Sequence, residues 1–543
     1  MVEPPMRRQM QREPITIDSI GEDLLYNTFS CLPAPSCASA ACVCRSWNRI
    51  ATRLLSSPKF SSALSLNPSL QGAVNEVINQ VLSQPIRPQF AIASIGPTFS
   101  LEEAHALIST KLGSRTPLVT CISQGISGKD ALTHEFKEVQ WDIVDDDDDD
   151  DENAGDVNML QNANFGVLLS VGFFPGLKVN LIPLLRNNQR TQGLMVDEFV
   201  LSIREYSYLV SGTTSPQGII LFSDPETNIK GVVVKMDFAF STETVILGDG
   251  GGKFLYQSDN TVNAMANQDG APAALALVFA NDRNKPPGLG DTQFHFLFSN
   301  GICPYGPTYK ARSVREREAD DTTWLTANRI AHKENLDGHA LIEHIMHEVG
   351  DDFEGQALYI GVMKKRKCSI GAEKVKWITF QEFHAVLRGD EEYLYVNDLG
   401  IKNGDTFRFY LSNPDTALSS CQTVSEKLRR LKHEFEDHTS RVGGGGVSNR
   451  DKKTILCGLT FTCCGRGESF FGRAKVDSLP LLDNFPGVPI AGIFCAGEIA
   501  RVGSSSSSYP EENRAAATAR CCFHVFSTAY LVVSYTPPAL PHR

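Results

Sequence analysis

The stretch Ser19–Ile50 reads SIGEDLLYNTFSCLPAPSCASAACVCRSWNRI. It opens with the form of a capping box, a hydroxyl at Ser19 and a carboxylate three residues later at Glu22, which predicts that a helix follows. The adjacent leucines and Phe29 give this helix one apolar face. Because proline disfavours helical geometry in the residue before it, we expect the helix to end at Pro33.

Two more short helices are expected in the rest of this stretch. Ser36 is placed to cap the second helix, which we expect to continue through Cys42. The third carries Val43, Trp47 and Ile50 at helical spacing, so these side chains share one stripe. Helices in so short a segment cannot bury all of this apolar surface among themselves. Either the rest of the chain or a partner protein must therefore cover it.

These residues resemble an F-box. The resemblance rests on two strings, Ile20-x-x-x-Leu24-Leu25-x-x-x-Phe29-x-x-Leu32-Pro33 and Ala41-Cys-Val-Cys-Arg-Ser-Trp-Asn-Arg-Ile50. The most telling part is Val43-Cys44-Arg45-x-Trp47. One departure is that F-boxes commonly open with Leu-Pro, whereas this stretch has Ser19-Ile20. The departure implies that the N-terminal part of this F-box binds its partner protein more weakly.

An F-box implies a docking site for the Skp-type adaptor of a cullin–RING ubiquitin ligase. By matching position, the apolar adaptor-binding surface would comprise Ile20, Leu24, Leu25, Phe29, Leu32, Pro33, Val43 and Trp47. Leucine and tryptophan side chains of this kind are plausible anchors of a protein interface. The alternative is that the helices form a lid on the rest of this chain.

Length and charge limit what the whole chain can be. Its 543 residues indicate several domains, since one hydrophobic core does not grow to that size. The formal net charge of −12 argues against general nucleic-acid binding, which needs clustered positive charge. Much of this charge lies in the tract Asp145–Glu152, whose adjacent carboxylates repel one another. The tract is expected to be a solvated loop, and a contact for a basic partner is the alternative.

Whether the 14 cysteines form disulfides depends on the cellular compartment of the protein. Residues 1–16 are polar and no long apolar run follows, so we expect no signal peptide and no membrane span. The expected location is the cytoplasm, the nucleus or both, where thiols stay reduced and disulfides are not expected. No cysteine spacing matches a zinc finger, so we expect no metal and no cofactor.

From Phe90 the sequence pattern becomes a mixture of strands and helices. A helix is expected at Leu101–Leu112. Short β-rich runs are typical of strands; they lie at Phe90–Ile95, Pro117–Ile122, Phe165–Val171, Val179–Ile182, Gly218–Phe222, Val232–Phe238, Ala274–Phe279, Thr406–Leu411, Thr454–Thr462, Val488–Cys495 and Ala529–Ser534. This alternation predicts a mixed α/β region.

Two segments near the C-terminus end in glycines and a charged residue. The strand predicted from Cys457 runs into a tight turn, and the strand predicted from Val488 ends at Gly497-Glu498. Strand ends of this composition are typical places to receive a ligand or a peptide. The candidate residues are Cys463, Gly465, Arg466, Gly467, Gly497 and Glu498. For Arg466 and Glu498 a structural salt bridge or turn is the alternative.

The two segments resemble the C-terminal half of FIST domains, in which Cys-x-Gly-Arg-Gly and Gly-x-x-x-x-Gly-Glu-Ile recur. The region Phe90–Phe279 looks like the N-terminal half, less specifically. An F-box followed by a FIST region is the arrangement of a group of F-box proteins of plants and animals. The resemblance implies that the FIST region recognises a protein substrate, and FIST domains are also thought to bind small molecules. The polar insertion Ser504–Ser508 departs from the compactness of the family.

The expected fold class is α+β, with a short all-α F-box of three helices followed by a mixed α/β FIST-like region in two halves. The expected divisions are a disordered lead at 1–16, the F-box at 17–57, a helical connector at 58–89, and FIST-like halves at 90–322 and 323–543.

Four other motifs do not carry a function by themselves. Gly248–Lys253 lacks the hydroxyl residue of a phosphate-binding loop. His339 and His344 lie too far apart around a helix to bind one ion. The basic run Lys364–Lys367 is equally compatible with a nuclear import signal and with a hairpin tip. A single leucine-rich-repeat-like string, Val476–Asn484, cannot stack into a solenoid.

The main hypothesis is a substrate-recognition subunit of an SCF-type (Skp–cullin–F-box) ubiquitin ligase. The F-box would dock the Skp-type adaptor and, through it, the cullin and RING subunits, while the FIST region binds the target. The chain itself would have no catalytic residues and is not expected to be an enzyme. The alternatives are a small-ligand sensor that uses the FIST region and, more weakly, an F-box/leucine-rich-repeat receptor.

Overall fold

The computed structural model describes residues 21–141, 164–186, 192–258, 272–330, 332–350, 356–441, 453–502 and 523–538. The chain divides into a first unit of residues 1–57 and 82–87 and a second unit of residues 58–81 and 88–543. The predictions for the lead 1–16, for Ser19 and Ile20, for the tract Asp145–Glu152 and for Ser504–Ser508 lie outside the described residues.

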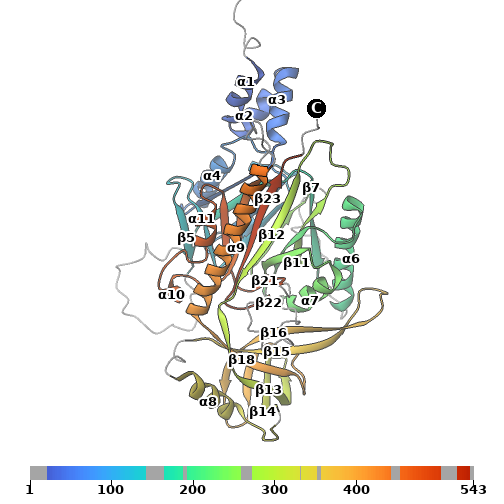
Figure 1. The fold of residues 1–543 in the computed structure, drawn as a ribbon, viewed down its shortest axis with the longest axis vertical. Helices are drawn as coiled ribbons and strands as arrows, with labels where there is room; N and C mark the ends of the chain where they lie inside the picture. Colours follow the sequence, from blue (N-terminus) through green and yellow to red (C-terminus); the bar gives the residue numbers. More distant parts are fainter. Residues whose placement is uncertain are drawn as a thin grey trace, which may run out of the picture. The chain divides into compact units, whose positions relative to one another are not determined.

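The first unit contains the three predicted helices, α1 (Glu22–Ser30), α2 (Ala34–Ala40) and α3 (Arg45–Leu55), drawn in blue in Figure 1. They close around a small core formed by Leu25, Phe29, Cys37, Ala40, Ile50, Ala51 and Leu54. The ring of Trp47 meets that of Phe29 edge to face, with 5.0 Å between the centroids. Aromatic pairs of this geometry stabilise a core beyond the area that they bury.

Three local predictions for these helices are wrong. The N-cap of α1 is Gly21 rather than Ser19, and no side chain caps the helix. Helix α2 begins directly after Pro33, because a proline in the first turn is already set for the helical φ, so Ser36 lies inside the helix instead of capping it. Val43 lies before α3 and therefore does not share the stripe on that helix.

The described strands of the second unit form three sheets and a closed barrel. The first sheet has the order β1 (Lys59–Ser65), β6 (Val167–Phe173), β2 (Phe90–Ile95), β3 (Leu118–Ile122), β10 (Phe254–Gln257). The second has the order β22 (Phe523–His524), β21 (Glu498–Ala500), β9 (Val245–Asp249), β8 (Gly218–Ser223), β11 (Pro272–Asn281), β7 (Leu177–Leu185). The third has the order β12 (Asp291–Ser299), β23 (Thr528–Thr536), β19 (Thr454–Cys463), β20 (Ile490–Cys495), β4 (Gly125–Lys129), β5 (Phe136–Gln140).

Most neighbouring strands are antiparallel, and the pairs β2–β3, β8–β9 and β19–β20 are parallel. One core joins the three sheets. Phe279 of the second sheet contacts both Phe90 of the first and Phe294 of the third. The ring centroids of Phe279 and Phe90 lie 5.2 Å apart, and those of Phe279 and Phe294 lie 5.1 Å apart.

Helices cover the outer faces of these sheets. Helices α6 (Gln192–Ser211) and α7 (Ile229–Ala239) pack on the second sheet, and α9 (Pro414–Arg441) and α11 (Leu479–Asn484) pack on the third, as Figure 1 shows. The remaining described helices of this unit are α4 (Leu70–Val81), α5 (Leu101–Leu112), α8 (Gly338–Val349) and α10 (Glu468–Phe471). No described helix is both long and apolar enough to cross a membrane.

The barrel has the strand order β13 (Ile302–Arg317), β14 (Thr322–Arg329), β17 (Leu394–Asn397), β16 (Lys376–Gly389), β15 (Leu358–Cys368), β18 (Thr406–Ser412). Its interior is filled by aliphatic and aromatic residues, among them Phe407 and Phe409. Helix α8 adds Leu341 and Ile345 to this core. Asp337 caps α8 by accepting a hydrogen bond from the N–H of Ala340.

The mixed α/β architecture that follows the three helices confirms the predicted fold class. The helix at Leu101–Leu112 has the predicted bounds, with Ser100 as its cap. The prediction of a strand at Val232–Phe238 is wrong, because this run lies in α7. Its buried residues include Ile229, Val232, Val233 and Met236, which recur with the period of a helix.

Two predicted divisions also differ from the structure. The segment 58–89 is not a helical connector, because β1 pairs with β6 inside the first sheet and α4 packs beside it in the second unit. The division after residue 322 falls inside β14, just after its first residue Thr322, and separates it from β13, its hydrogen-bonded neighbour in the barrel. Strand pairing therefore sets these boundaries, across a long sequence distance for β1 and β6 and within a hairpin for β13 and β14, and local composition gave no signal for it.

Candidate functional site

The predicted adaptor-binding residues of the first unit divide by exposure. Leu25 is 5% exposed and Phe29 is 3% exposed, so both belong to the core and the prediction that they form a surface is wrong. Leu24 is 62% exposed and Val43 is 63% exposed. Pro33 is also exposed, whereas Leu32 and Trp47 are half-buried. The exposed apolar surface of this unit therefore includes Leu24, Pro33 and Val43.

This distribution follows from the small size of the unit. A bundle of three short helices has room inside for one apolar side chain of the Leu24-Leu25 pair, and Leu25 occupies it. The indole Nε1 of Trp47 is buried without a hydrogen-bond partner among the described residues. Leu24 and Val43, each more than half exposed, are thus left uncovered by the core of this unit.

Arg466, predicted as a ligand contact, lies fully buried between β19 and α10. Its Nε donates to Asp477 Oδ2 at 2.9 Å, and its Nη2 donates to Asp477 Oδ1 at 2.6 Å. The guanidinium also donates to the carbonyl of Phe526 at 3.0 Å and to Ser299 Oγ at 3.2 Å. All of its faces are therefore used inside the protein, which favours the structural salt bridge over the ligand contact.

The glycines after β19 permit close packing of the turn that carries Arg466. Gln140 of β5 donates from Nε2 to the carbonyls of Cys464, at 2.9 Å, and of Arg466, at 2.5 Å. Gly467 has a φ of +142°, and a Cβ there would lie 1.9 Å from Gln140 Oε1. A Cβ at Gly465 would lie 2.9 Å from the ring of Phe526. The turn is thus locked from two sides.

Glu498 does not meet Arg466. It lies on β21 directly opposite Asp249 of β9, and both carboxyl groups are buried. Burial raises the pKa of Glu498 to about 7, and burial also raises the pKa of Asp249 to about 7. Ser527 donates to Glu498 Oε1 from its N–H at 3.0 Å and from its hydroxyl at 3.3 Å.

The structure brings together two motifs that the sequence separates by more than two hundred residues. The N–H of Gly250, in the glycine-rich string, donates to the carbonyl of Gly497 at 2.7 Å. Asp249 Oδ1 accepts from the N–H of Gly251 at 3.2 Å and from that of Gly497 at 3.4 Å. A Cβ at Gly251 would lie 2.4 Å from the Cβ of Ala496. The glycine-rich string therefore serves as packing against β21.

Cysteines surround this carboxyl pair. The hydrogen bond between neighbouring Cys463 and Cys464 raises the pKa of the first thiol and lowers that of the second. Burial raises the pKa of Cys495 well above its ordinary value. The twelve described cysteines are free thiols, and no group of three or more potential metal ligands occurs among the described residues.

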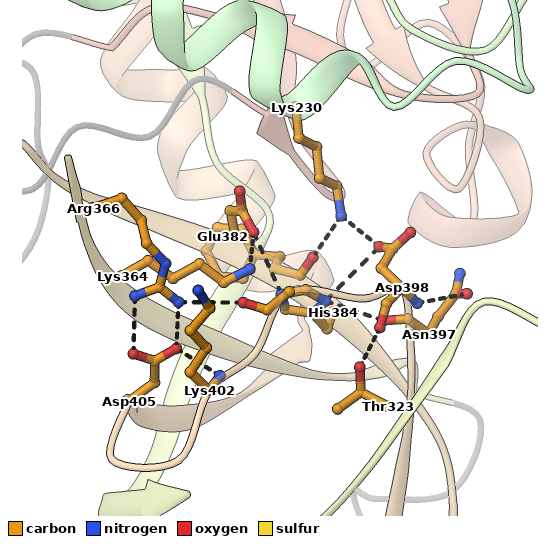
Figure 2. Close-up of polar contacts among 12 residues, drawn as sticks. Lys230, Thr323, Lys364, Arg366, Glu382, His384, Asn397, Asp398, Lys402 and Asp405 are labelled. Atoms are coloured by element: carbon orange, nitrogen blue, oxygen red, sulfur yellow. Dashed lines mark hydrogen bonds and ion pairs between the residues drawn. The ribbon is translucent and has the colours of Figure 1, made fainter. Parts of the chain in front are cut away.

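A second polar cluster joins α7 to the barrel (Figure 2). Lys230 of α7 forms an ion pair with Asp398 and donates from Nζ to the carbonyl of Phe383 at 3.3 Å. The neighbouring His384 is buried, and its Nδ1 lies 3.0 Å from the carbonyl of Asn397. Burial, with Lys230 beside it, holds the pKa of His384 well below its ordinary value, so this histidine is neutral.

The basic run Lys364–Lys367 forms the rest of this cluster. It lies within β15 and not at the hairpin tip, so that prediction is wrong. Lys364 is buried in an ion pair with Glu382, and Arg366 pairs with Asp405 at 2.8 Å, as Figure 2 shows. Two of the four side chains of the predicted nuclear import signal are therefore held by carboxylates.

The leucine-rich-repeat-like string lies largely in α11, which packs against α9. A repeat of that kind would place its leucines on a strand, so the solenoid alternative has no support in the described residues. Sequence reasoning also missed Asp477, Asp249 and Lys230. Asp249 stood in the glycine-rich string Gly248–Lys253 and Asp477 in the leucine-rich-repeat-like string, whereas Lys230 stood in no motif.

Comparison with known proteins identifies two domains. Residues 17–57 match the F-box domain family and residues 384–501 match the FIST C domain family. The F-box/LRR-repeat protein At5g63520 of Arabidopsis thaliana is 37% identical over 527 residues, which cover 96% of this chain and 94% of that protein. Two uncharacterized proteins of Mycobacterium tuberculosis, MT0656 and Rv0628c, are 44% identical over 50 residues, 9% of this chain and 13% of each.

F-box proteins are typically non-catalytic subunits that present substrates to SCF-type ubiquitin ligases. The F-box match covers the first unit, and the FIST C match contains Arg466 and Glu498 as well as the barrel strands from His384 onward. The long relative shares the whole span. The chain therefore belongs to the F-box proteins that carry a FIST C domain.

Proposed function

We propose that this chain holds a Skp-type adaptor through Leu24 and Val43 of the first unit, while the second unit binds the protein to be ubiquitinated. The observation that carries the proposal is the exposure of these two side chains beside a core that is already full. Ubiquitin transfer would come from the cullin and RING subunits that the adaptor brings, and this chain would contribute proximity. The cytoplasm and the nucleus are the proposed locations.

The test is a pull-down of the Skp-type adaptor with the full chain. The double variant Leu24→Ser, Val43→Ser is expected to bind the adaptor at least about tenfold more weakly, because apolar anchors carry most of the energy of an interface. Substitutions of exposed residues change folding stability by only about 0.5 kcal/mol, so the chain should still fold. Leu132→Ser, which changes a leucine 70% exposed in the second unit, is the matched control.

Unchanged adaptor binding by the double variant would show that these residues do not form the docking surface. The role of the second unit is tested separately, by affinity purification with the ligase inhibited. Proteins captured equally by the wild type and by the double variant are held by the second unit. If every captured protein is lost with the adaptor, the second unit does not bind targets on its own.

A further inference from the structure

Strand β16 is longer than the strand beside it. It pairs with β15 along Lys376–Ala385, but it pairs with β17 only through Val386–Gly389. The hairpin of β15 and β16 thus continues beyond the barrel, and Figure 1 shows it reaching toward α6 and α7. Among the described residues no strand pairs with the other side of Lys376–Ala385. Within the described part of the chain, residues 376–382 therefore form an open strand edge, and the carbonyl of Phe383 beyond them accepts from Lys230.

The direction of the backbone groups on this edge follows from one contact. Lys230 Nζ, on α7, donates to the carbonyl of Phe383, so this residue points its backbone groups away from β15. In an antiparallel ladder alternate residues face the same side. Trp377, Thr379 and Gln381 therefore also point their N–H and C=O groups away from β15.

A second contact gives the same alternation independently. The N–H of Ser412 donates to the carbonyl of Ala357 at 3.1 Å, so Ala357 faces β18. Alternate residues of β15 then face β16, and Lys364 is one of them. Because Lys364 lies opposite Phe380 in the register, Phe380 faces inward and Thr379 faces outward.

The free edge borders a groove of about 480 Å³. We call it the α7–β16 groove; its lining includes Val233, Val234 and Phe238 of α7, Phe523 of β22 and the edge residues 376–382. The groove therefore combines unpaired backbone groups on one wall with apolar side chains on the other. This is the arrangement in which an extended peptide adds as a strand and its side chains enter pockets.

The far end of the hairpin is fixed, so the groove is preformed. Ile370, in the loop between β15 and β16, is 1% exposed and packs into the core of α6 and α7. The N–H of Gly371 donates to Asp197 Oδ2 at 3.1 Å, and Arg204 pairs with Glu373. A peptide that enters the groove would not have to order the hairpin first.

The charges of the α7–β16 groove favour an acidic occupant. Its carboxylates are neutralised from inside the protein, Asp237 by Arg501 at 2.7 Å and Glu382 by Lys364. Lys376 lies over the ring of Phe238 at 5.8 Å and has no carboxylate partner among the described residues.

The adjacent hairpin face adds positive charge. Trp377 is 60% exposed, and the ammonium groups of Lys365 and Lys367 lie 5.8 and 5.4 Å from its ring centroid. A strand added to the edge would run between this face and Lys376, so carboxylates on both faces of the strand would meet lysines.

We propose that the α7–β16 groove binds an extended acidic peptide by strand addition. The peptide backbone bonds to Trp377, Thr379 and Gln381, and its carboxylates lie near Lys376 and the two lysines around Trp377. Apolar side chains of the peptide pack on Phe238. The inference rests on the proposed function only in taking this peptide to be a segment of the protein that is ubiquitinated.

The test uses a fluorescein-labelled peptide of about ten residues in which pairs of glutamates alternate with pairs of valines, so that each face of the strand carries both residue types. The peptide is titrated with the full chain and followed by fluorescence anisotropy. Thr379→Pro removes one outward N–H, and we expect affinity to fall about tenfold; Thr379→Ala keeps that N–H and should stay within about twofold. Lys376→Glu should also lower the affinity for the peptide about tenfold.

The same peptide with its alternate amides N-methylated should not bind. This experiment tests strand addition without any change in the protein.

Three results would overturn the proposal: no saturable binding by the wild type, equal loss with Thr379→Ala and Thr379→Pro, or equal affinity for the N-methylated peptide. Binding that appears only when Asp145–Asp151 are replaced by asparagine would also overturn it, because the occupant would then be this chain's own acidic tract. Binding that weakens as the protein concentration rises would make a second copy the occupant. Adaptor pull-down with the same variants separates failure of the groove from failure of the proposed function.

Discussion

The turn that carries Arg466 and the α7–β16 groove both place a basic residue beside an aromatic ring, and they differ in whether the described residues also supply a carboxylate for it. Arg466 is fully buried, and protein groups occupy both of its terminal nitrogens and its Nε. In the groove, Lys376 has an aromatic ring beneath it and no carboxylate partner among the described residues. The first region is completed by the chain's own carboxylate, whereas the second is where we propose that an acidic peptide supplies one.

In this protein the recognisable motifs and the proposed binding groove lie in different places. Cys-x-Gly-Arg-Gly and Gly-Glu-Ile are the residues by which the FIST resemblance is recognised, and the structure uses them to join strands that are distant in sequence. The groove is formed by a helix and a strand edge whose sequences carry no motif.

The largest expected effect is on folding stability, which a substitution of Arg466 should lower much more than a substitution of Lys376. Arg466→Met leaves Asp477 buried and uncompensated, so we expect a loss of about 3–5 kcal/mol in the free energy of unfolding. Lys376→Met changes an exposed side chain and should cost no more than about 0.5 kcal/mol. Chemical denaturation of both variants, followed by tryptophan fluorescence, measures the difference. Equal midpoints for the two variants would mean that the Arg466 pair is not structural.

A smaller effect concerns the carboxyl pair behind that turn. Because the folded pKa of Glu498 is raised to about 7, the stability that its protonated form contributes is full below the unfolded value and is lost as pH rises through about 7. Glu498→Gln removes this dependence, so the variant should gain on the wild type between pH 5 and pH 8, by up to about 3 kcal/mol. Thermal unfolding midpoints across this range measure it.

Glu468→Gln, a change at an exposed position close in the chain, is the control for Glu498→Gln and should follow the wild type at each pH. If the unfolding midpoint of Glu498→Gln differs from that of the wild type by the same amount at each pH, the buried carboxyl does not change its protonation in this range. The pair with Asp249 would then have to be ionised or neutral throughout.

Much of the fold could be predicted where local chemistry decides it. Helix α5 follows from Ser100 and the apolar period after it, and strand β2 follows from its run of small and β-branched residues. Helix α7 was missed because its adjacent valines favour a strand locally, while burial of one helical face against the second sheet overrides that preference. The F-box helices were found through a resemblance as well as a pattern.

The candidate site could be predicted only in part, for a related reason. Arg466 and Glu498 were both found as candidates, but the carboxyl groups beside them were not, Asp477 for Arg466 and Asp249 for Glu498. Nothing in a single sequence gives that partner choice. Leu24 and Leu25 are adjacent and chemically identical, and only the packing of α1 on α3 decides which of them faces out.

The smallest expected effect comes from removing a carboxylate at one end of the α7–β16 groove. Asp398 holds Lys230 at one end of the groove and is itself 43% exposed, so their ion pair contributes little to stability. Asp398 has a φ of +70°, a conformation in which asparagine is well tolerated, so Asp398→Asn should fold normally. The change frees the charge of Lys230 and should tighten binding of the glutamate–valine peptide by about two- to fivefold at low salt.

The control is Asp483→Asn, which removes the same charge from an exposed position on α11 and should leave the affinity unchanged. The anisotropy titration measures the affinity of both variants. Equal tightening by the two variants would mean that net charge, and not the groove, attracts the peptide.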